Sequence, residues 1–208
     1  MTIPGPAGDL ESILEFDPAV PPLMAAVICH PHPLYGGAMH NKVVFRCARA
    51  ARSAGMAALR FNFRGVGKSQ GVYDRGMGER GDVMAALDYL SARFGDLPAC
   101  VLGFSFGAWV GMRVGGEDAR VKALVGLGLP ANDLDFSYLS GVTKPKLVVQ
   151  GANDQFSRRD DVQAIFDGLT GSKQIHWVEG ADHFFTGRLE EVEPIVHAFL
   201  SRIVTSSG

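Results

Sequence analysis

Several features are scarce or missing in this sequence of 208 residues, and each absence argues against a class of protein. There are only three cysteines, Cys29, Cys47 and Cys100, and each lies within an apolar run or face. An odd number in such settings argues against a disulfide framework and predicts reduced, buried thiols. No apolar segment approaches the length that crosses a bilayer, and residues 1–15 lack the basic start and apolar core of a signal peptide. We therefore expect a cytoplasmic protein with no membrane partner.

An excess of charge of either sign is also missing. Lys and Arg total 20 and Asp and Glu total 22, so the net charge is −2, and no basic stripe is visible along the chain. A nucleic acid is therefore not an expected partner. The sequence contains no low-complexity tract, and its apolar share of 47% is enough to form a substantial core. We expect residues 1–208 to form a single domain.

The sequence does contain an alternation of short apolar runs with longer amphipathic segments. Helical spacing of apolar residues marks Glu79–Phe94 and the segment 189–203, and Asn41 is placed to cap a helix that runs to Ser53. Such alternation predicts an α/β fold with a mostly parallel sheet and helices on both faces, in which ligands bind beyond the carboxyl ends of the strands. The predicted strands are Leu10–Phe16, Met24–His30, Ala57–Phe63, Ala99–Phe104, Val121–Gly126, Lys146–Gln150 and Gln174–Val178.

Ser105 lies in the pattern G-F-S-F-G at positions 103–107, which follows the apolar run 99–102 and precedes a helix-like stretch at 108–114. Strand, tight turn and helix are the context in which G-x-S-x-G marks a nucleophile. The strained turn pushes the hydroxyl out at the top of a sheet, and the N–H of Phe106 points to where an oxyanion would form. A glycine-rich turn with an incidental serine is the alternative, and the pentapeptide by itself does not decide between them.

A serine hydroxyl is a poor nucleophile that needs a base, and the base needs a group that orients it. Asp154 follows the predicted strand Lys146–Gln150, and His183 follows the predicted strand Gln174–Val178. Serine, aspartate and histidine thus stand in this order after successive strand ends. Their common position predicts that Ser105, Asp154 and His183 form a catalytic triad.

Other acidic and histidine residues compete for these roles. Asp182 is adjacent to His183, and neighbouring side chains in a loop generally diverge. The remaining acids have the positions of first-turn helix charges, and the remaining histidines fall inside predicted elements or precede the serine. The weaker candidates are Asp160, Asp161 and Asp182 for the orienting group and His30, His32, His40, His176 and His197 for the base.

The segment H-P-H-P-L-Y-G-G at positions 30–37 follows the predicted strand Met24–His30. Acyl transfer needs a second N–H donor opposite the one that follows the nucleophile, and a glycine-bearing loop at this place supplies it. Proline has no N–H, so Leu34 is the first candidate for this donor and Tyr35 is the second.

Two other patterns resemble ligand sites but are incomplete. His30 and His32 have the spacing of a shared metal site, yet no carboxylate stands close by, so we favour a structural role in which the imidazoles hold the loop. The loop R-G-V-G-K-S at 64–69 resembles the end of a phosphate-binding loop, but Asn62 stands where the first glycine is required and no helix follows directly. We interpret it as a structural loop and expect neither a metal nor a cofactor.

Together these residues resemble the α/β-hydrolase superfamily over positions 20–200. The likeness is greatest to the compact serine-hydrolase branch related to dienelactone hydrolases, whose members carry a loop like 30–37, and an R-G-x-G-x-S loop like 64–69 is common in the superfamily. The resemblance implies that Ser105 is the nucleophile, His183 the general base and acid, and Asp154 the orienting group. Phe106 and a residue near Leu34 would supply the oxyanion N–H groups. Dienelactone hydrolases proper carry a cysteine nucleophile, so their substrate is not transferred to this chain.

Many superfamily members insert a cap domain after the sixth strand, but the segment 127–145 is too short to form one. We therefore expect a fold without a cap, an open site, and a short helix at its rim within 133–139. Aromatic side chains near the motifs favour an apolar acyl or alcohol group, although each is also a candidate for the core. These candidate substrate-binding residues are Tyr35, Phe104, Phe156 and Phe184, and Phe106 lies beside them.

The sequence thus leads to the hypothesis of a serine hydrolase, and most directly of a carboxylesterase that acts on a small-molecule ester through an acyl-enzyme on Ser105. Hydrolysis of thioester, lactone or amide bonds uses the same groups and stays open. A non-catalytic binding protein with a hydrolase fold also stays open, as does a homodimer formed through an exposed edge strand or the C-terminal helix.

Overall fold

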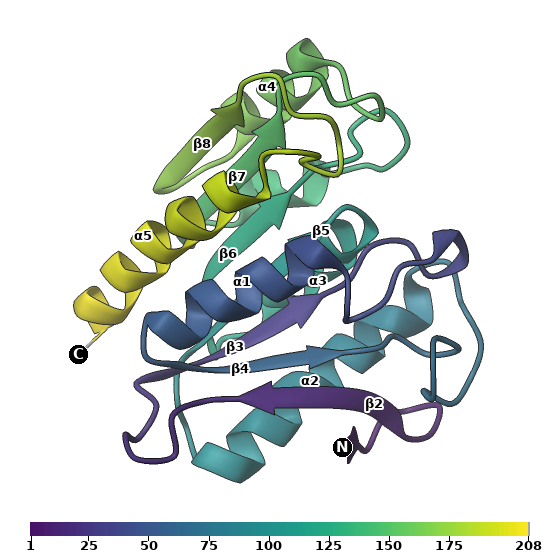
Figure 1. Ribbon diagram of the computed structural model, residues 1–208, viewed down its shortest axis with the longest axis vertical. Helices are drawn as coiled ribbons and strands as arrows, with labels where there is room; N and C mark the ends of the chain where they lie inside the picture. Colours follow the sequence, from purple (N-terminus) through teal and green to yellow (C-terminus); the bar gives the residue numbers. More distant parts are fainter. Residues whose placement is uncertain (208) are drawn as a thin grey trace.

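A computed structural model describes residues 1–207, and an eight-stranded sheet forms its centre (Figure 1). The strands are β1 (Thr2–Ile3), β2 (Leu10–Glu15), β3 (Met24–Cys29), β4 (Met56–Phe61), β5 (Ala99–Phe104), β6 (Val121–Leu127), β7 (Lys146–Gly151) and β8 (Lys173–Val178). Their order across the sheet is β1-β2-β4-β3-β5-β6-β7-β8. The pairs β1–β2 and β2–β4 are antiparallel, and every other neighbouring pair is parallel. The predicted mostly parallel sheet is confirmed.

Helices cover both faces of the sheet, as the sequence predicted. They are α1 (Lys42–Ser53), α2 (Met77–Phe94), α3 (Phe106–Glu117), α4 (Arg159–Gly168) and α5 (Leu189–Ser207). α1 and α5 lie side by side on one face, in front of the sheet in Figure 1, while α2, α3 and α4 pack on the other. Along β3, Ala26 faces α1 and α5 whereas Val27 faces the opposite layer, because successive strand side chains point to opposite faces. Burial on both faces explains why the strand sequences are apolar without interruption.

Local sequence signals determine where α1 begins and ends. The Asn41 side chain accepts a hydrogen bond from the N–H of Val43 at 2.9 Å, which satisfies a donor that the first helical turn leaves free. Gly55 follows the last turn with φ of 81°, a left-handed conformation that glycine adopts without steric cost. The predicted cap and stop of this helix are both confirmed.

The connection between β6 and β7 contains a single turn of 3₁₀ helix, Ser137–Gly141, instead of the predicted helix over 133–139. The Asp135 carboxylate accepts hydrogen bonds from the N–H and the hydroxyl of Ser137, both at 2.8 Å, and this turn directs the chain away from helix before position 137. No cap domain stands between these strands. Sequence periodicity also missed β1, which is only two residues long, and indicated α4 only through its first-turn acids.

The loop after β4 is held by side chains buried at the carboxyl end of the sheet. Ser69 donates to the carbonyl of Asn62 at 2.7 Å and accepts from the N–H of Glu11 at 2.9 Å. The guanidinium of Arg64 contacts the Asp82 carboxylate of α2 at 2.7 Å, and the Arg64 N–H donates to the same carboxylate at 3.0 Å. These contacts confirm the interpretation of residues 64–69 as a structural loop.

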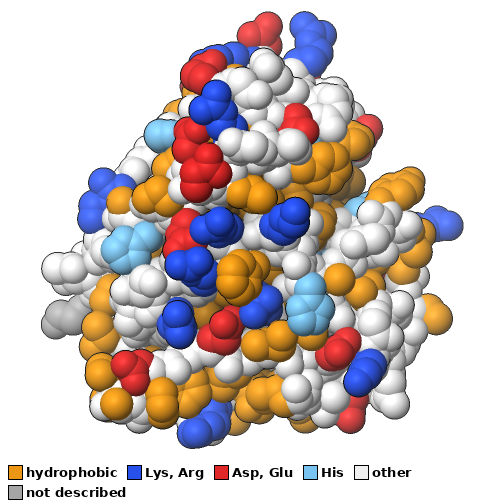
Figure 2. Space-filling model, viewed as in Figure 1, with side chains coloured by type: hydrophobic (Ala, Val, Ile, Leu, Met, Phe, Trp, Pro, Cys, Tyr) orange, Lys and Arg blue, Asp and Glu red, His pale blue; other side chains and the backbone are white. Residues whose placement is uncertain are grey.

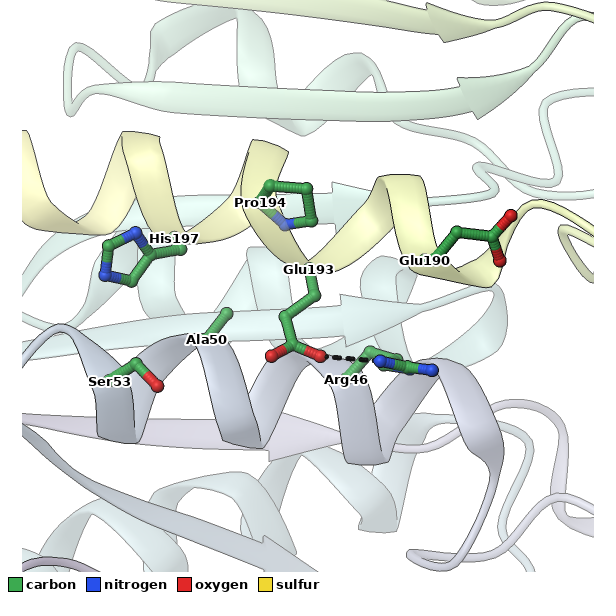
Figure 3. A pocket seen from close by; sticks show the side chains of 7 residues that line it. All are labelled: Arg46, Ala50, Ser53, Glu190, Glu193, Pro194 and His197. Carbon is green, nitrogen blue, oxygen red and sulfur yellow. Dashed lines mark hydrogen bonds and ion pairs between the residues drawn. The ribbon is translucent and has the colours of Figure 1, made fainter.

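Ion pairs connect the neighbouring helices α1 and α5. Glu193 of α5 contacts Arg46 of α1 at 2.9 Å (Figure 3) and Arg49 at 3.3 Å, beside a hollow of about 370 Å³. Acidic and basic side chains lie next to one another on this face of the molecule (Figure 2). Within residues 1–207, no helix is both long enough and apolar enough to span a bilayer.

Replacing Asp82 with alanine is expected to lower the free energy of unfolding by about 3 kcal/mol or more, because it leaves the Arg64 guanidinium without its buried partner. The Asp82 side chain is 0% exposed. Urea denaturation followed by circular dichroism measures the change.

A matched control is the Asp88→Ala variant. Asp88 also contacts an arginine, Arg120, at 2.7 Å, but its side chain is 66% exposed. Removing an exposed partner should cost less than about 1 kcal/mol. Equal losses in the two variants would contradict the argument from burial.

Candidate active site

Ser105 occupies a tight turn between β5, which ends at Phe104, and α3, which begins at Phe106. Its backbone has φ of 57° and ψ of −122°, a conformation that residues with a Cβ rarely adopt. The cost of such a conformation is of order 1–3 kcal/mol, and it persists only where neighbouring structure enforces it. The turn exposes the serine hydroxyl at the carboxyl end of the sheet, as the sequence predicted.

The two glycines of the motif are required by close backbone contacts. A Cβ atom on Gly103 would lie 2.2 Å from the carbonyl oxygen of Gly107. A Cβ atom on Gly107 would lie 2.4 Å from the carbonyl oxygens of both Cys29 and His30 at the end of β3. The first turn of α3 therefore packs directly on the neighbouring strand, and any side chain at either position would push it away.

The structure brings together the three residues predicted to form a triad. Nε2 of His183 lies 3.0 Å from Oγ of Ser105, and Nδ1 of His183 lies 2.8 Å from Oδ2 of Asp154. Asp154 is on the loop after β7, and His183 is on the loop after β8. The side chains of Asp154 and His183 are 0% and 4% exposed, so water does not compete for their mutual hydrogen bond.

Two further groups hold the Asp154 carboxylate. Gln150, near the end of β7, donates from Nε2 to Oδ2 of Asp154 at 2.7 Å, and the N–H of Phe156 donates to Oδ1 at 2.7 Å. Gln150 also accepts the N–H of Leu129 through Oε1 at 2.8 Å, which fixes the orientation of its amide. Sequence reasoning did not single out Gln150. An amide that directly follows the apolar run 147–149 was the available signal in the sequence.

Among the described residues, the competing acids and histidines take no part in the hydrogen bonds that join Ser105, His183 and Asp154. Oδ1 of Asp182 accepts the N–H groups of Phe184 and Thr186, at 3.0 and 2.9 Å, and so shapes the loop that carries His183. Burial raises the pKa of Asp182, but the hydrogen bonds from these N–H groups lower it, and the net pKa is below its usual value. Asp160 and Asp161 lie in the first turn of α4, as the sequence predicted, while His176 lies in β8 and His197 in α5.

Around Ser105, the N–H groups proposed for an oxyanion hole differ in what they contact. The N–H of Phe106, at the start of α3, has no hydrogen-bond partner among the residues that the structure describes. The N–H of Leu34 donates to Nδ1 of His32 at 3.2 Å, and the N–H of Tyr35 donates to the carbonyl of His32 at 3.1 Å. Both amides favoured by the sequence therefore already have acceptors. The N–H of His32 itself has none within residues 1–207.

His30 and His32 hold the loop in the structural manner that the sequence favoured. The buried His30 ring accepts the N–H of Phe63 at Nε2, 3.0 Å away, and donates from Nδ1 to the carbonyl of Pro31 at 2.6 Å. Burial lowers the pKa of His30 to about 4, which keeps the ring neutral and preserves the acceptor. Nε2 of His32 lies 3.1 Å from the hydroxyl of Tyr73, and burial lowers the pKa of His32 as well.

A cavity of about 760 Å³ opens above Ser105. Three of the four aromatic residues predicted to bind substrate line it, namely Tyr35, Phe156 and Phe184. Phe104 instead is buried beneath His183, with its ring centroid 5.1 Å from the imidazole. The lining residues are Pro31, His32, Tyr35, Gly36, Gly37, Asn41, Ser105, Phe106, Pro130, Asp133, Leu134, Phe156, His183 and Phe184.

Comparisons with known proteins find relatives over most of the chain. A family model described as an alpha/beta hydrolase domain matches residues 26–195. An uncharacterized protein of Rickettsia prowazekii (strain Madrid E) is 38% identical over 188 residues, which cover 86% of this chain and 79% of that protein. The structure of an alpha-beta serine hydrolase homologue from Coxiella burnetii has a TM-score of 0.91 at 36% identity and covers 96% of each chain. A Xanthomonas campestris protein described as a serine hydrolase without lid has a TM-score of 0.88 at 33% identity, over 97% of this chain and 93% of that one.

His30→Gln is expected to flatten the acid limb of the stability profile. The pKa of His30 is about 4 in the folded protein against 6.5 for the free side chain, so the unfolded chain binds more protons between these values. The native protein should therefore lose roughly 3 kcal/mol through this residue as the pH falls from 7 to 4. Urea titrations at several pH values measure it.

The glutamine amide can keep both hydrogen bonds of His30 without titrating. His176→Gln, at an exposed position in β8, serves as the control and should follow the native profile. If His30→Gln showed the native slope between pH 6.5 and 4, the assignment of a buried, neutral His30 would be incorrect.

Proposed function

Since this chain belongs to the alpha/beta hydrolase family, we propose that it is a carboxylesterase that cleaves small esters through an acyl-enzyme on Ser105. The observation that carries the proposal is the continuous hydrogen-bonded path from Ser105 through His183 to Asp154, with distances of 3.0 and 2.8 Å. Each group follows the carboxyl end of a strand, and Ser105 and His183 line one cavity. A fold retained only for binding would not require this path.

In the first step, Oγ of Ser105 attacks the ester carbonyl carbon while its proton moves to Nε2 of His183. The Asp154 carboxylate accepts a hydrogen bond from the N–H at Nδ1 of His183. The lone pair of Nε2 is therefore directed at Ser105. The same carboxylate stabilises the imidazolium that forms. Gln150 and the Phe156 N–H act as positioning groups, because they hold both carboxylate oxygens of Asp154 in place.

The negative charge that develops on the carbonyl oxygen needs N–H donors placed in advance. We assign one to Phe106, at the start of α3, where the helix dipole adds to the effect. We assign the second to His32, because its N–H is unengaged among the described residues and its ring packs 5.1 Å from that of Phe106. Leu34 or Tyr35 would have to give up an existing hydrogen bond to serve in its place.

Collapse of the tetrahedral intermediate breaks the bond between carbonyl carbon and alkoxy oxygen, and His183 returns its proton to the leaving alcohol. Water then attacks the acyl-enzyme with His183 again as base, and the acid product leaves as the proton returns to Ser105. The chain's own side chains supply every proton transfer in this scheme. The open cavity, without a cap above it, gives water direct access to the acyl-enzyme, which favours hydrolysis over acyl transfer.

Ser105→Ala is expected to lower kcat for p-nitrophenyl esters by about 10⁴- to 10⁶-fold, because it removes the nucleophile of a group that acts as a unit. Acetate to decanoate esters are assayed by release of nitrophenolate. Ser12→Ala, a change at a buried serine of β2, is the control and should keep native activity. Native turnover that survived in Ser105→Ala would refute the mechanism.

Asp154→Asn should lower kcat by about 10⁴-fold, since an amide at this place no longer selects the tautomer in which Nε2 accepts the serine proton. Asp182→Asn is the matched variant one residue from His183. An asparagine oxygen can still accept the N–H groups of Phe184 and Thr186, so activity should stay within about tenfold of native. Steady-state kinetics on p-nitrophenyl acetate distinguish the two, and a reversed ranking would assign the orienting role to Asp182.

A further inference from the structure

Asp133 places at the wall of the catalytic cavity a carboxylate that has no partner in the part of the chain that the structure describes. It lies on the loop after β6, it is exposed, and it lines the same cavity as Ser105 and His183. Its N–H donates to the carbonyl of Pro130 at 3.2 Å, but its side chain has no hydrogen bond or ion pair with any residue of the range 1–207. A carboxylate exposed to water is ionised at neutral pH.

No lysine or arginine balances this charge among the residues that line the cavity. Arg158, on the neighbouring loop, directs its guanidinium to Asp161 at 3.8 Å. His32 uses Nδ1 to accept the Leu34 N–H, and so its ring is neutral in the observed arrangement. His183 also lines the cavity, and its ring is hydrogen-bonded to the buried Asp154 carboxylate. The unbalanced charge that a substrate meets is therefore negative.

Asp133 lines the cavity together with Phe156 and Phe184. Its loop is tied to the one that carries Phe156, because the N–H of Ala131 donates to Oγ of Ser157 at 2.7 Å. The rings of Phe156 and Phe184 flank His183, with centroids 4.7 and 5.2 Å from the imidazole. Since His183 returns its proton to the alcohol in the proposed mechanism, these rings border the place where the alcohol departs, and Asp133 lines the same cavity.

Aromatic faces beside a free carboxylate are the chemistry that recognises an alkylammonium group, through cation–π attraction and direct charge pairing. We propose that Asp133 makes this site selective for esters whose alcohol portion carries a positive charge and disfavours those whose alcohol portion is anionic. The selection rests on the proposed esterase function and adds a specificity-determining residue to it.

Three acetate esters of similar size test the selection in the native protein. They are the cationic choline ester, its uncharged isostere 3,3-dimethylbutyl acetate, and the anionic 4-acetoxybutanoate. At low ionic strength, kcat/KM for the cationic ester should exceed that for the neutral ester by about fivefold, and the anionic ester should be slower than the neutral one by a similar factor. Salt at about 0.5 M should reduce both differences, because it screens exposed charges.

Asp133→Asn should bring the cationic-to-neutral ratio close to one, and Asp133→Lys should invert it. Asp135→Asn is the matched control, because its carboxylate is bonded to Ser137 and does not line the cavity. This control should keep the native ratio. A native ratio of one, or a ratio that Asp133→Asn leaves unchanged, would overturn the charge selection while turnover of the neutral ester still supported the esterase.

Binding to Ser105→Ala separates the two proposals when turnover does not. This variant keeps every other lining residue of the cavity, so calorimetric titration with the choline ester and with its neutral isostere measures selection without chemistry. Tighter binding of the cationic ester, lost on addition of Asp133→Asn, supports the selection even if the native protein cleaves none of the esters. Equal affinities for the two esters overturn it.

Discussion

The reversal of the chain at Ser105 is the constraint on which the rest of the site depends. A positive φ at this serine aims its hydroxyl out of the sheet, and the same turn presses the start of α3 against the carbonyls at the end of β3. That contact leaves no room for a Cβ at Gly107. It also brings the N–H of Phe106, which has no acceptor among the described residues, next to the loop that begins at His30. One strained turn thus positions the proposed nucleophile and one proposed oxyanion donor together.

Burying a polar side chain costs free energy unless it has hydrogen-bond partners. The buried carboxylates of Asp154 and Asp82 both have such partners. Asp154 has His183, Gln150 and a backbone N–H, while Asp82 of α2 has Arg64. Both carboxylates are fully buried and both lie near the carboxyl ends of the strands. The hydrogen bonds that stabilise this end of the sheet also fix the geometry of the candidate active site. The interactions that stabilise the fold at this end of the sheet therefore lie close to those that position the proposed catalytic groups.

Much of this arrangement could be predicted from the sequence because it follows from patterns of local range. Apolar runs that are buried on both faces predicted the strands of the parallel sheet, and glycines around Ser105 predicted the turn. Sequence reasoning did not identify Gln150 and Asp133, because their proposed roles arise only when loops distant in sequence come together. Leu34 was favoured for its N–H, but sequence alone does not show that the adjacent His32 ring accepts that N–H. Likewise, Asp135 redirects the chain after β6 through a side-chain contact that helical periodicity does not contain.

The proposed nucleophile and its proposed base follow strands in different parts of the sheet. Ser105 follows β5, which is buried along its whole length, whereas His183 follows β8, an edge strand that is buried only at its last residue. Local opening of a protein is easiest where fewest side chains are buried. Fraying of β8 would separate the imidazole from the hydroxyl while the central strands remain folded. Activity would then be lost at a lower denaturant concentration than the far-ultraviolet circular dichroism signal. Activity would measure the stability of the weakest strand of the fold and not that of its core.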